Sequence, residues 1–157
     1  MAEAELDLLR QVLAEAEEWV DSGGGPFAAG ILLDGEVLAL AHNEVVASCD
    51  PTAHAEMTAI RMATRGRGTH DLTGAVLVCS CEPCPMCLAA AWWARVGRIV
   101  YSATRADASA AGFDDTAVYD EVARPLHERR LPTVRALAAD GNRPFEAWAR
   151  SPNRIPY

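Results

Sequence analysis

The chain has 157 residues, 50% of them hydrophobic, and this length and composition fit one compact domain with a proper core. Its formal net charge of −8 disfavours long nucleic acids as partners, because proteins that bind phosphate backbones normally carry a basic face. The N-terminus lacks the pattern of a signal peptide, and every apolar stretch is broken before membrane-spanning length. We therefore expect a single domain over residues 1–157, cytoplasmic, with neither nucleic acid nor membrane as a partner.

The first predicted elements are a helix and a hairpin. Apolar residues recur at intervals of three and four over residues 6–20, which predicts an amphipathic helix that the Gly-rich segment 22–26 ends. Two apolar runs follow, at 27–33 and 36–41. They are joined by Asp34-Gly35, a dipeptide that tolerates the positive φ angles of a type I′ turn, so we expect a β-hairpin.

The rest of the chain alternates helices with short strands. Asp50-Pro51-Thr52 supplies capping oxygens and a proline suited to a first helical turn. The expected elements are then a helix to about residue 65, a loop at 66–74, a strand at 76–78, a helix opened by Pro83 and running to 95, a strand at 99–101, a helical or irregular stretch at 106–111, a strand at 133–137 and a helix at 144–150. This alternation implies an α/β sheet with helices on both faces, and the hairpin makes the sheet mixed.

A metal site is predicted from clustered cysteines and one histidine. Four of the five cysteines crowd into residues 79–87, which indicates metal ligation before it indicates disulfides. His54-Ala55-Glu56 followed by Pro83-Cys84-Pro85-Met86-Cys87 matches the H-x-E and P-C-x-x-C signature of zinc-dependent deaminases. Cys84 and Cys87 share one face at a helix start, where the helix dipole favours thiolates. We expect one Zn²⁺ per chain, held by His54, Cys84 and Cys87, with the fourth tetrahedral position left to water.

Glu56 is the expected catalytic residue. It lies two positions from His54 and so does not share its helix face, which suits a carboxylate that is not a ligand. As a general base it would accept a proton from water, then return protons to a ring nitrogen and the departing amine.

Two other interpretations use the same residues. One is a structural site of four cysteines, which would add Cys79 and Cys81 to the pair at 84 and 87. Four ligands in nine residues that span a strand end and a helix start surround one ion poorly, and buried cysteines in a strand are more simply small apolar residues. The other is a zinc or interaction module without catalysis, which would not need a carboxylate such as Glu56 beside an open metal position.

Beyond the zinc motif, residues 25–157 resemble the guanine deaminases of the cytidine deaminase superfamily. The matching segments are Gly25-Pro26-Phe27, residues 50–56, residues 80–88, Trp93-Ala94-Arg95, Ala111-Gly112-Phe113-Asp114-Asp115 and the terminal Tyr157. The resemblance implies a cytidine deaminase-like, three-layer α/β/α fold with a mixed five-stranded sheet. It also implies a homodimer in which residues 151–157 form a swapped tail that crosses to the neighbouring active site.

The resemblance further implies the reaction, which is the hydrolytic deamination of the free nucleobase guanine to xanthine and ammonia. Asn43 and Asp115 would hydrogen-bond the purine, and Phe27 and Trp93 would line its faces. Tyr157 would close the partner's pocket. Glu146 is a further polar contact.

Departures from the family pattern leave the substrate open. Ala28 stands where the relatives have glycine, the turn at 23–25 is Gly-rich, and Pro156 precedes the terminal tyrosine. Alternative substrates are an aminotriazine such as ammeline, cytosine and a guanine nucleoside. A tRNA adenosine deaminase shares the zinc motif but needs a basic surface, which the net charge disfavours.

Overall fold

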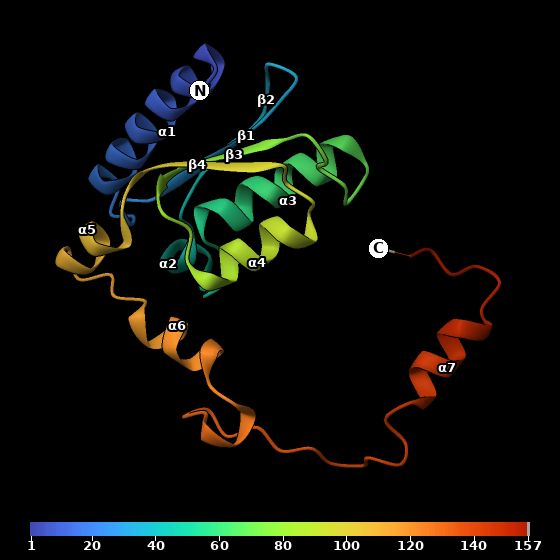
Figure 1. Cartoon of the computed structure of the whole chain (residues 1–157). Helices are drawn as coiled ribbons and strands as arrows, with labels where there is room; N and C mark the ends of the chain where they lie inside the picture. The colour runs from blue at the N-terminus through green and yellow to red at the C-terminus, as the bar shows by residue number, and fades with distance from the viewer. Residues whose placement is uncertain (157) are drawn as a thin grey trace. The chain divides into compact units, whose positions relative to one another are not determined.

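Four strands form a mixed sheet in the first part of the chain (Figure 1). The structure is a computed structural model and describes residues 1–156. The strands are β1 (Ala28–Leu33), β2 (Glu36–His42), β3 (Val76–Cys81) and β4 (Arg98–Ala103), in the order β2-β1-β3-β4. β1 pairs antiparallel with β2 and β3, whereas β3 and β4 are parallel, so the sheet is mixed as expected.

The turn between β1 and β2 has the predicted backbone. Asp34 and Gly35 both adopt left-handed conformations, with φ angles of 52° and 84°. These are the signs that a type I′ turn requires at its two central residues. The hairpin pairs Ala29 with Ala41, and on the other side of β1 the same residue pairs with Cys79. This register places the sheet centre beside the cysteine-rich end of β3.

Helices cover the two faces of the sheet, which gives the predicted α/β/α layers (Figure 1). On one face lies α1 (Glu3–Asp21), whose Leu8 and Val12 pack among buried residues of β1 and β3. On the other lie α3 (Ala55–Arg67) and α4 (Pro85–Trp93). Nine of the fourteen buried residues in this second core cluster are alanines, and such small side chains let helices come close to the strands.

Residues from Tyr119 onward form a second compact unit, whereas Met1–Val118 form the first. The second unit contains most of α6 (Thr116–Ala123), a short 3₁₀ helix at Leu126–Glu128 and α7 (Arg143–Arg150). Within it the Glu121 carboxylate accepts hydrogen bonds from the backbone N–H groups of Arg130 and Leu131. Among residues 1–156, no helix has both the length and the apolar character to cross a membrane.

The expected fifth strand is absent, so the sheet has four strands and the predicted segment at 133–137 is irregular. Val134 and Leu137 are exposed there, and Leu137 has a positive φ of 49°, which is incompatible with a strand. The local pattern of apolar residues thus predicted a strand that has no partner to complete its backbone hydrogen bonds.

Helix starts also differ from the expectation near the cysteine and histidine motifs. Asp50 accepts hydrogen bonds from the backbone and side chain of Thr52 and so forms a turn, and α3 begins only at Ala55. α4 begins at Pro85 instead of Pro83. Both shifts leave a metal-site residue at the N-cap. Three short helices were not predicted or only partly so, namely α2 (Val45–Ser48), α5 (Arg105–Ala110) and α6.

Candidate active site

The predicted metal ligands come from the first turns of two neighbouring helices. His54 is the N-cap residue of α3 and Cys84 is the N-cap residue of α4, with Cys87 in the first turn of α4. Their ligand atoms form a triangle in which the His54 Nδ1, Cys84 Sγ and Cys87 Sγ atoms are each 3.6 Å apart.

This triangle has the dimensions of one face of a zinc tetrahedron. With Zn–S near 2.3 Å and Zn–N near 2.0–2.1 Å, tetrahedral angles give ligand–ligand distances of about 3.5–3.8 Å. Over residues 1–156, these three are the one group of His, Cys, Asp and Glu side chains with the spacing to hold a metal. The residues present therefore fit a three-ligand zinc site and leave one position of the tetrahedron for a fourth ligand.

The other two cysteines of the cluster lie outside this triangle. Cys79 is buried in the alanine-rich core between the sheet and the helices. Cys81 is also buried, and its thiol lies 3.6 Å from the backbone carbonyl of Thr104. The four-cysteine alternative thus lacks the geometry that a shared ion requires.

The pKa values of the two ligand thiols are shifted in opposite directions. The hydrogen bond from Cys87, reinforced by His54, lowers the pKa of Cys84 to about 4. That same hydrogen bond and burial raise the pKa of Cys87, because a second thiolate beside the first is unfavourable. The contact with Cys84 also raises the pKa of His54. Metal binding must therefore displace at least the Cys87 proton.

Glu56 is a buried carboxyl beside the three ligands. It lies in the first turn of α3 with only 9% of its surface exposed. Burial is the largest cause that raises the pKa of Glu56, since desolvation disfavours the charged carboxylate. A raised pKa makes the carboxylate of Glu56 a better proton acceptor than an exposed glutamate, which suits a general base.

His54, Cys84 and Glu56 line a cavity of about 420 Å³, which lies entirely within the first unit. Its wall combines two aromatic rings, several acidic groups and small residues. The lining residues are Gly25, Phe27, Asn43, Val45, Val46, His54, Glu56, Cys81, Glu82, Cys84, Arg105, Ala108, Gly112, Phe113, Asp114 and Asp115.

The outer wall of the cavity is ordered by contacts among its own residues. The rings of Phe27 and Phe113 meet edge to face, with centroids 4.9 Å apart. The Arg105 guanidinium lies 3.9 Å from the Asp115 carboxylate. Asp114 accepts from the backbone N–H of Thr116 and so serves the turn before α6. Both adjacent aspartates line the cavity, and Asp114 also holds this turn.

The structure brings three of the predicted substrate residues to this cavity. Asn43, Phe27 and Asp115 line the cavity. Trp93 does not, because it lies at the far end of α4, six residues beyond Cys87, and its side chain is 71% exposed. Glu146 lies on α7 in the second unit, where it pairs with Arg150 at 3.9 Å, and Tyr157 lies outside the described residues.

Glu82, Arg105 and Phe113 are among the cavity residues that were not predicted from the sequence as site residues. Glu82 sits inside the recognised run before Pro83, and Phe113 directly precedes the two aspartates, so both had a signal in the matching segments. Arg105 had none. It reaches the cavity because the backbone N–H of Arg105 donates to the Glu82 carboxylate across 3.3 Å, which joins the chain after β4 to the chain after β3.

The mixed sheet between helices and the His-Cys-Cys triangle beside a buried glutamate together define a zinc-binding deaminase, and residues 2–103 match the family described as the cytidine and deoxycytidylate deaminase zinc-binding region. Guanine deaminase of Bacillus subtilis (strain 168) is 44% identical over 95% of this chain and 96% of its own length. An X-ray structure of guanine deaminase from Bacillus subtilis matches with a TM-score of 0.95 and 42% identity, covering 100% of this chain and 99% of that chain. The chain belongs to the guanine deaminase branch of this family.

Other relatives match over a shorter length. A structure of guanine deaminase from Nitrosomonas europaea is 35% identical, with a TM-score of 0.65, over 68% of this chain and 63% of that chain. A tRNA-specific adenosine deaminase of Aquifex aeolicus is 41% identical, over 60% of this chain and 63% of its own length. The likeness to tRNA deaminases is therefore partial, whereas the likeness to the guanine deaminase of Bacillus subtilis spans the chain.

We predict one zinc ion per chain that does not depend on Cys79 or Cys81. The double variant Cys79→Ala and Cys81→Ala should retain the metal, because neither thiol belongs to the triangle. The matched variant Cys87→Ala should lose it, since two ligands hold zinc far more weakly than three. Atomic emission spectroscopy of the purified proteins measures both. Zinc loss from the double variant Cys79→Ala and Cys81→Ala would restore the four-cysteine site.

Proposed function

We propose that this protein hydrolyses guanine, a small-molecule nucleobase, to xanthine and ammonia, with Glu56 as the proton carrier. The observation that supports this most strongly is the buried carboxyl of Glu56 beside a three-ligand zinc site that opens into a cavity. A purely structural zinc site uses four protein ligands and needs no carboxyl of raised pKa next to it. This feature argues against the module without catalysis.

Each part of the site has a distinct task in this proposal. Zinc bound to His54, Cys84 and Cys87 supplies a Lewis acid that lets water act as a nucleophile at neutral pH. Glu56 accepts a proton from the attacking water. It passes this proton to a ring nitrogen, then accepts the second proton from the hydroxyl group now on the ring carbon and passes it to the departing amine, so that ammonia leaves as a neutral molecule. The apolar surroundings that raise the Glu56 pKa keep the proton available for these transfers.

The cavity has the size and the wall composition for a flat heterocycle. A volume of about 420 Å³ lies within the usual range for small-ligand sites. Phe27 and Phe113 offer ring edges and faces for a planar base, and Asn43 and Asp115 offer a hydrogen-bonding amide and carboxylate at the wall. The carboxylate accepts from purine N–H groups, which an amide in its place would pair with poorly.

We propose guanine over the alternative substrates because the relative that matches along the whole chain is a guanine deaminase. Ammeline, cytosine and a guanine nucleoside present the same amino-substituted ring carbon. Ammonia release across guanine, ammeline, cytosine, adenine and their nucleosides tests this order. We expect guanine to be turned over faster than every other compound. Faster turnover of another base would make that base the proposed substrate in place of guanine. A tRNA substrate is disfavoured by the net charge of −8.

The assembly proposed here is a homodimer with exchanged tails. Large apolar side chains are exposed on α4 at Leu88, Trp92 and Trp93, and a second copy of the chain would remove them from water. Residues 151–157 form the proposed tail, with Tyr157 over the partner's cavity. Glu146 as a polar contact and the cytoplasmic location remain predictions.

The variant Glu56→Gln should keep zinc and fold but lose turnover of guanine by about 10²–10⁴-fold, because the amide keeps the shape and cannot carry the proton. Glu17→Gln, an exposed change of the same kind on α1, is the matched control. Steady-state ammonia release and metal content give the two readouts. Turnover close to that of the control would remove Glu56 from the mechanism, and loss of zinc would make it a ligand.

The variant Asp115→Asn should reduce kcat/KM for guanine while zinc content stays at one per chain. A site built to hydrogen-bond its substrate discriminates strongly when one partner is mismatched. Asp107→Asn is the control, since Asp107 is an exposed capping carboxylate on α5. Unchanged guanine kinetics in Asp115→Asn would mean that Asp115 does not contact the substrate and only shapes the turn before α6.

Deletion of residues 156 and 157 should lower turnover and leave zinc content and the melting temperature nearly unchanged, because the tail covers the substrate and not the core. A mixed dimer separates the two possible directions of closure. One chain lacks the tail and the other carries Glu56→Gln, so a crossed tail restores one working site. An inactive mixed dimer, with the deletion also inactive, would place each tail over its own subunit.

A further inference from the structure

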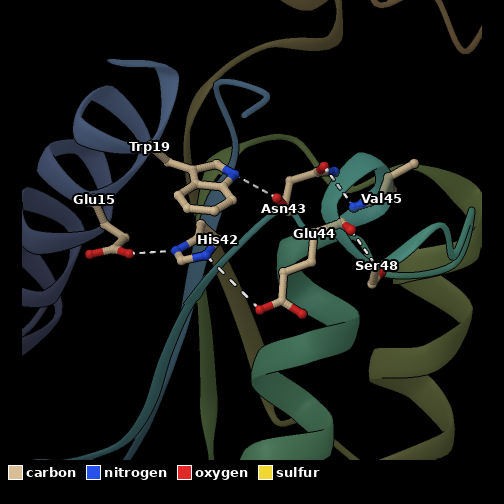
Figure 2. Close-up of polar contacts among 7 residues, drawn as sticks. All are labelled: Glu15, Trp19, His42, Asn43, Glu44, Val45 and Ser48. Atoms are coloured by element: carbon tan, nitrogen blue, oxygen red, sulfur yellow. Dashed lines mark hydrogen bonds and ion pairs between the residues drawn. The ribbon is translucent and has the colours of Figure 1, made fainter. Parts of the chain in front are cut away.

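Helix α1 lies on the face of the sheet away from the metal site, yet its C-terminal end contacts a cavity residue. The indole Nε1–H of Trp19 donates a hydrogen bond to the backbone carbonyl of Asn43 across 2.7 Å, as Figure 2 shows. Asn43 directly follows β2 and lines the cavity. A helix whose other inward residues only cover the sheet thus reaches a residue of the substrate cavity.

Two further hydrogen bonds hold Asn43, one through its backbone and one through its side chain. Its backbone N–H donates to the carbonyl of Phe27 across 2.9 Å. Its side-chain Oδ1 accepts from the backbone N–H of Val45 across 3.2 Å, which assigns the amide oxygen to that contact (Figure 2). This contact orients the side-chain amide of Asn43, whose NH₂ group can donate to a ligand.

The indole of Trp19 is itself fixed by a histidine and a glutamate. The His42 ring stacks on it, with centroids 3.7 Å apart and planes inclined by 18°. The Glu15 carboxylate lies 2.7 Å from His42 Nδ1, and the Glu44 carboxylate lies 4.0 Å from Nε2 (Figure 2). Glu15 and Trp19 are four residues apart on α1 and so share one helix face. The same helix therefore contacts one face of the His42 ring through Trp19 and its Nδ1 atom through Glu15.

The loop after α1 is shaped to this indole. A Cβ atom on Gly24 would lie 1.9 Å from the Trp19 Nε1 atom, so no other residue fits there without displacing the ring. The backbone N–H of Gly24 also donates to the Trp19 carbonyl across 3.0 Å. Gly25, one residue further on, lines the cavity together with Asn43. The Gly-rich turn that departs from the family pattern is therefore in contact with the indole that holds Asn43.

We propose that Trp19, stacked on His42 and supported by Glu15, is a positioning residue that fixes Asn43 so that its amide NH₂ faces the substrate as a donor. This proposal rests on the proposed function, because its kinetic test uses guanine as the substrate. It assigns a substrate-selecting role to α1, because a donor at this point favours bases that present an acceptor there.

A double-mutant cycle with guanine tests whether Trp19 acts through Asn43. Trp19→Phe keeps an aromatic ring for stacking and removes the N–H donor. It should lower kcat/KM about threefold to tenfold, the effect of one hydrogen bond, mainly through KM. In the Asn43→Ala background the same change should have no further effect. Equal losses in both backgrounds would overturn the proposal, because they would mean that Trp19 acts on the fold.

Glu15→Gln provides a second variant in case Trp19→Phe folds poorly, with Glu18→Gln on the exposed side of α1 as its control. Glu15→Gln should reduce kcat/KM in the parent enzyme and not in Asn43→Ala, whereas Glu18→Gln should do neither. A loss of equal size in both backgrounds again overturns the proposal. Unchanged guanine kinetics in the Asn43→Ala variant would also overturn the proposal. In that case, guanine turnover by the unaltered enzyme would still support the proposed function.

If the unaltered enzyme turns over no guanine, the proposed function fails. The contact between Trp19 and Asn43 can then be tested without substrate, by hydrogen exchange. The Trp19 indole N–H, assigned by its disappearance in Trp19→Phe, should exchange slowly with solvent in the unaltered chain. It should exchange faster in Glu15→Gln than in Glu18→Gln. Equal exchange in all three proteins would overturn the proposal.

Discussion

The close approach of α3 and α4 to one face of the sheet is the constraint on which the site depends. All three ligand atoms come from the first turns of these helices, so their 3.6 Å spacing is set by where each helix begins and how deeply it packs. Alanines on α3, α4 and the facing strands permit that depth. A larger side chain at this layer would move a helix axis, and the ligands of one ion would move with it.

The helix starts matter as much as the packing depth. Because His54 and Cys84 are N-cap residues, the site lies at the positive ends of two helix dipoles. This field and the contact with Cys87 agree with the low pKa of Cys84. Glu56, in the first turn of α3, lies in the same field, yet burial dominates and raises its pKa. The pKa values of Cys84 and Glu56 are thus shifted in opposite directions by their surroundings.

The sequence predicted those features whose cause is local. The period of α1, the Asp34-Gly35 turn and the motif around His54 and Cys84 each depend on neighbouring residues, and the structure has all of them. The strand expected at 133–137 was wrong because strand formation needs a partner, which no local pattern can supply. Trp93 was expected at the cavity from a matching segment alone, and its position at the end of α4 is a matter of helix geometry.

The positions of Arg105 and Trp19 could not be predicted from the sequence, because they depend on contacts that are distant along the chain. Their places depend on Glu82 and Asn43, residues far away along the chain, and neither pair has a sequence signature. What could be predicted of the site was the metal and its proton carrier. The outer wall of the cavity required the fold.

The order of the cavity residues along the chain has an evolutionary consequence. The metal ligands and Glu56 lie within residues 2–103, the region shared across the deaminase family, whereas Arg105, Ala108, Gly112, Phe113, Asp114 and Asp115 follow it. Descendants of one ancestral gene can therefore inherit the hydrolytic chemistry unchanged and diverge in the segment after β4. A change in that short stretch alters the cavity wall and replaces no ligand of the metal.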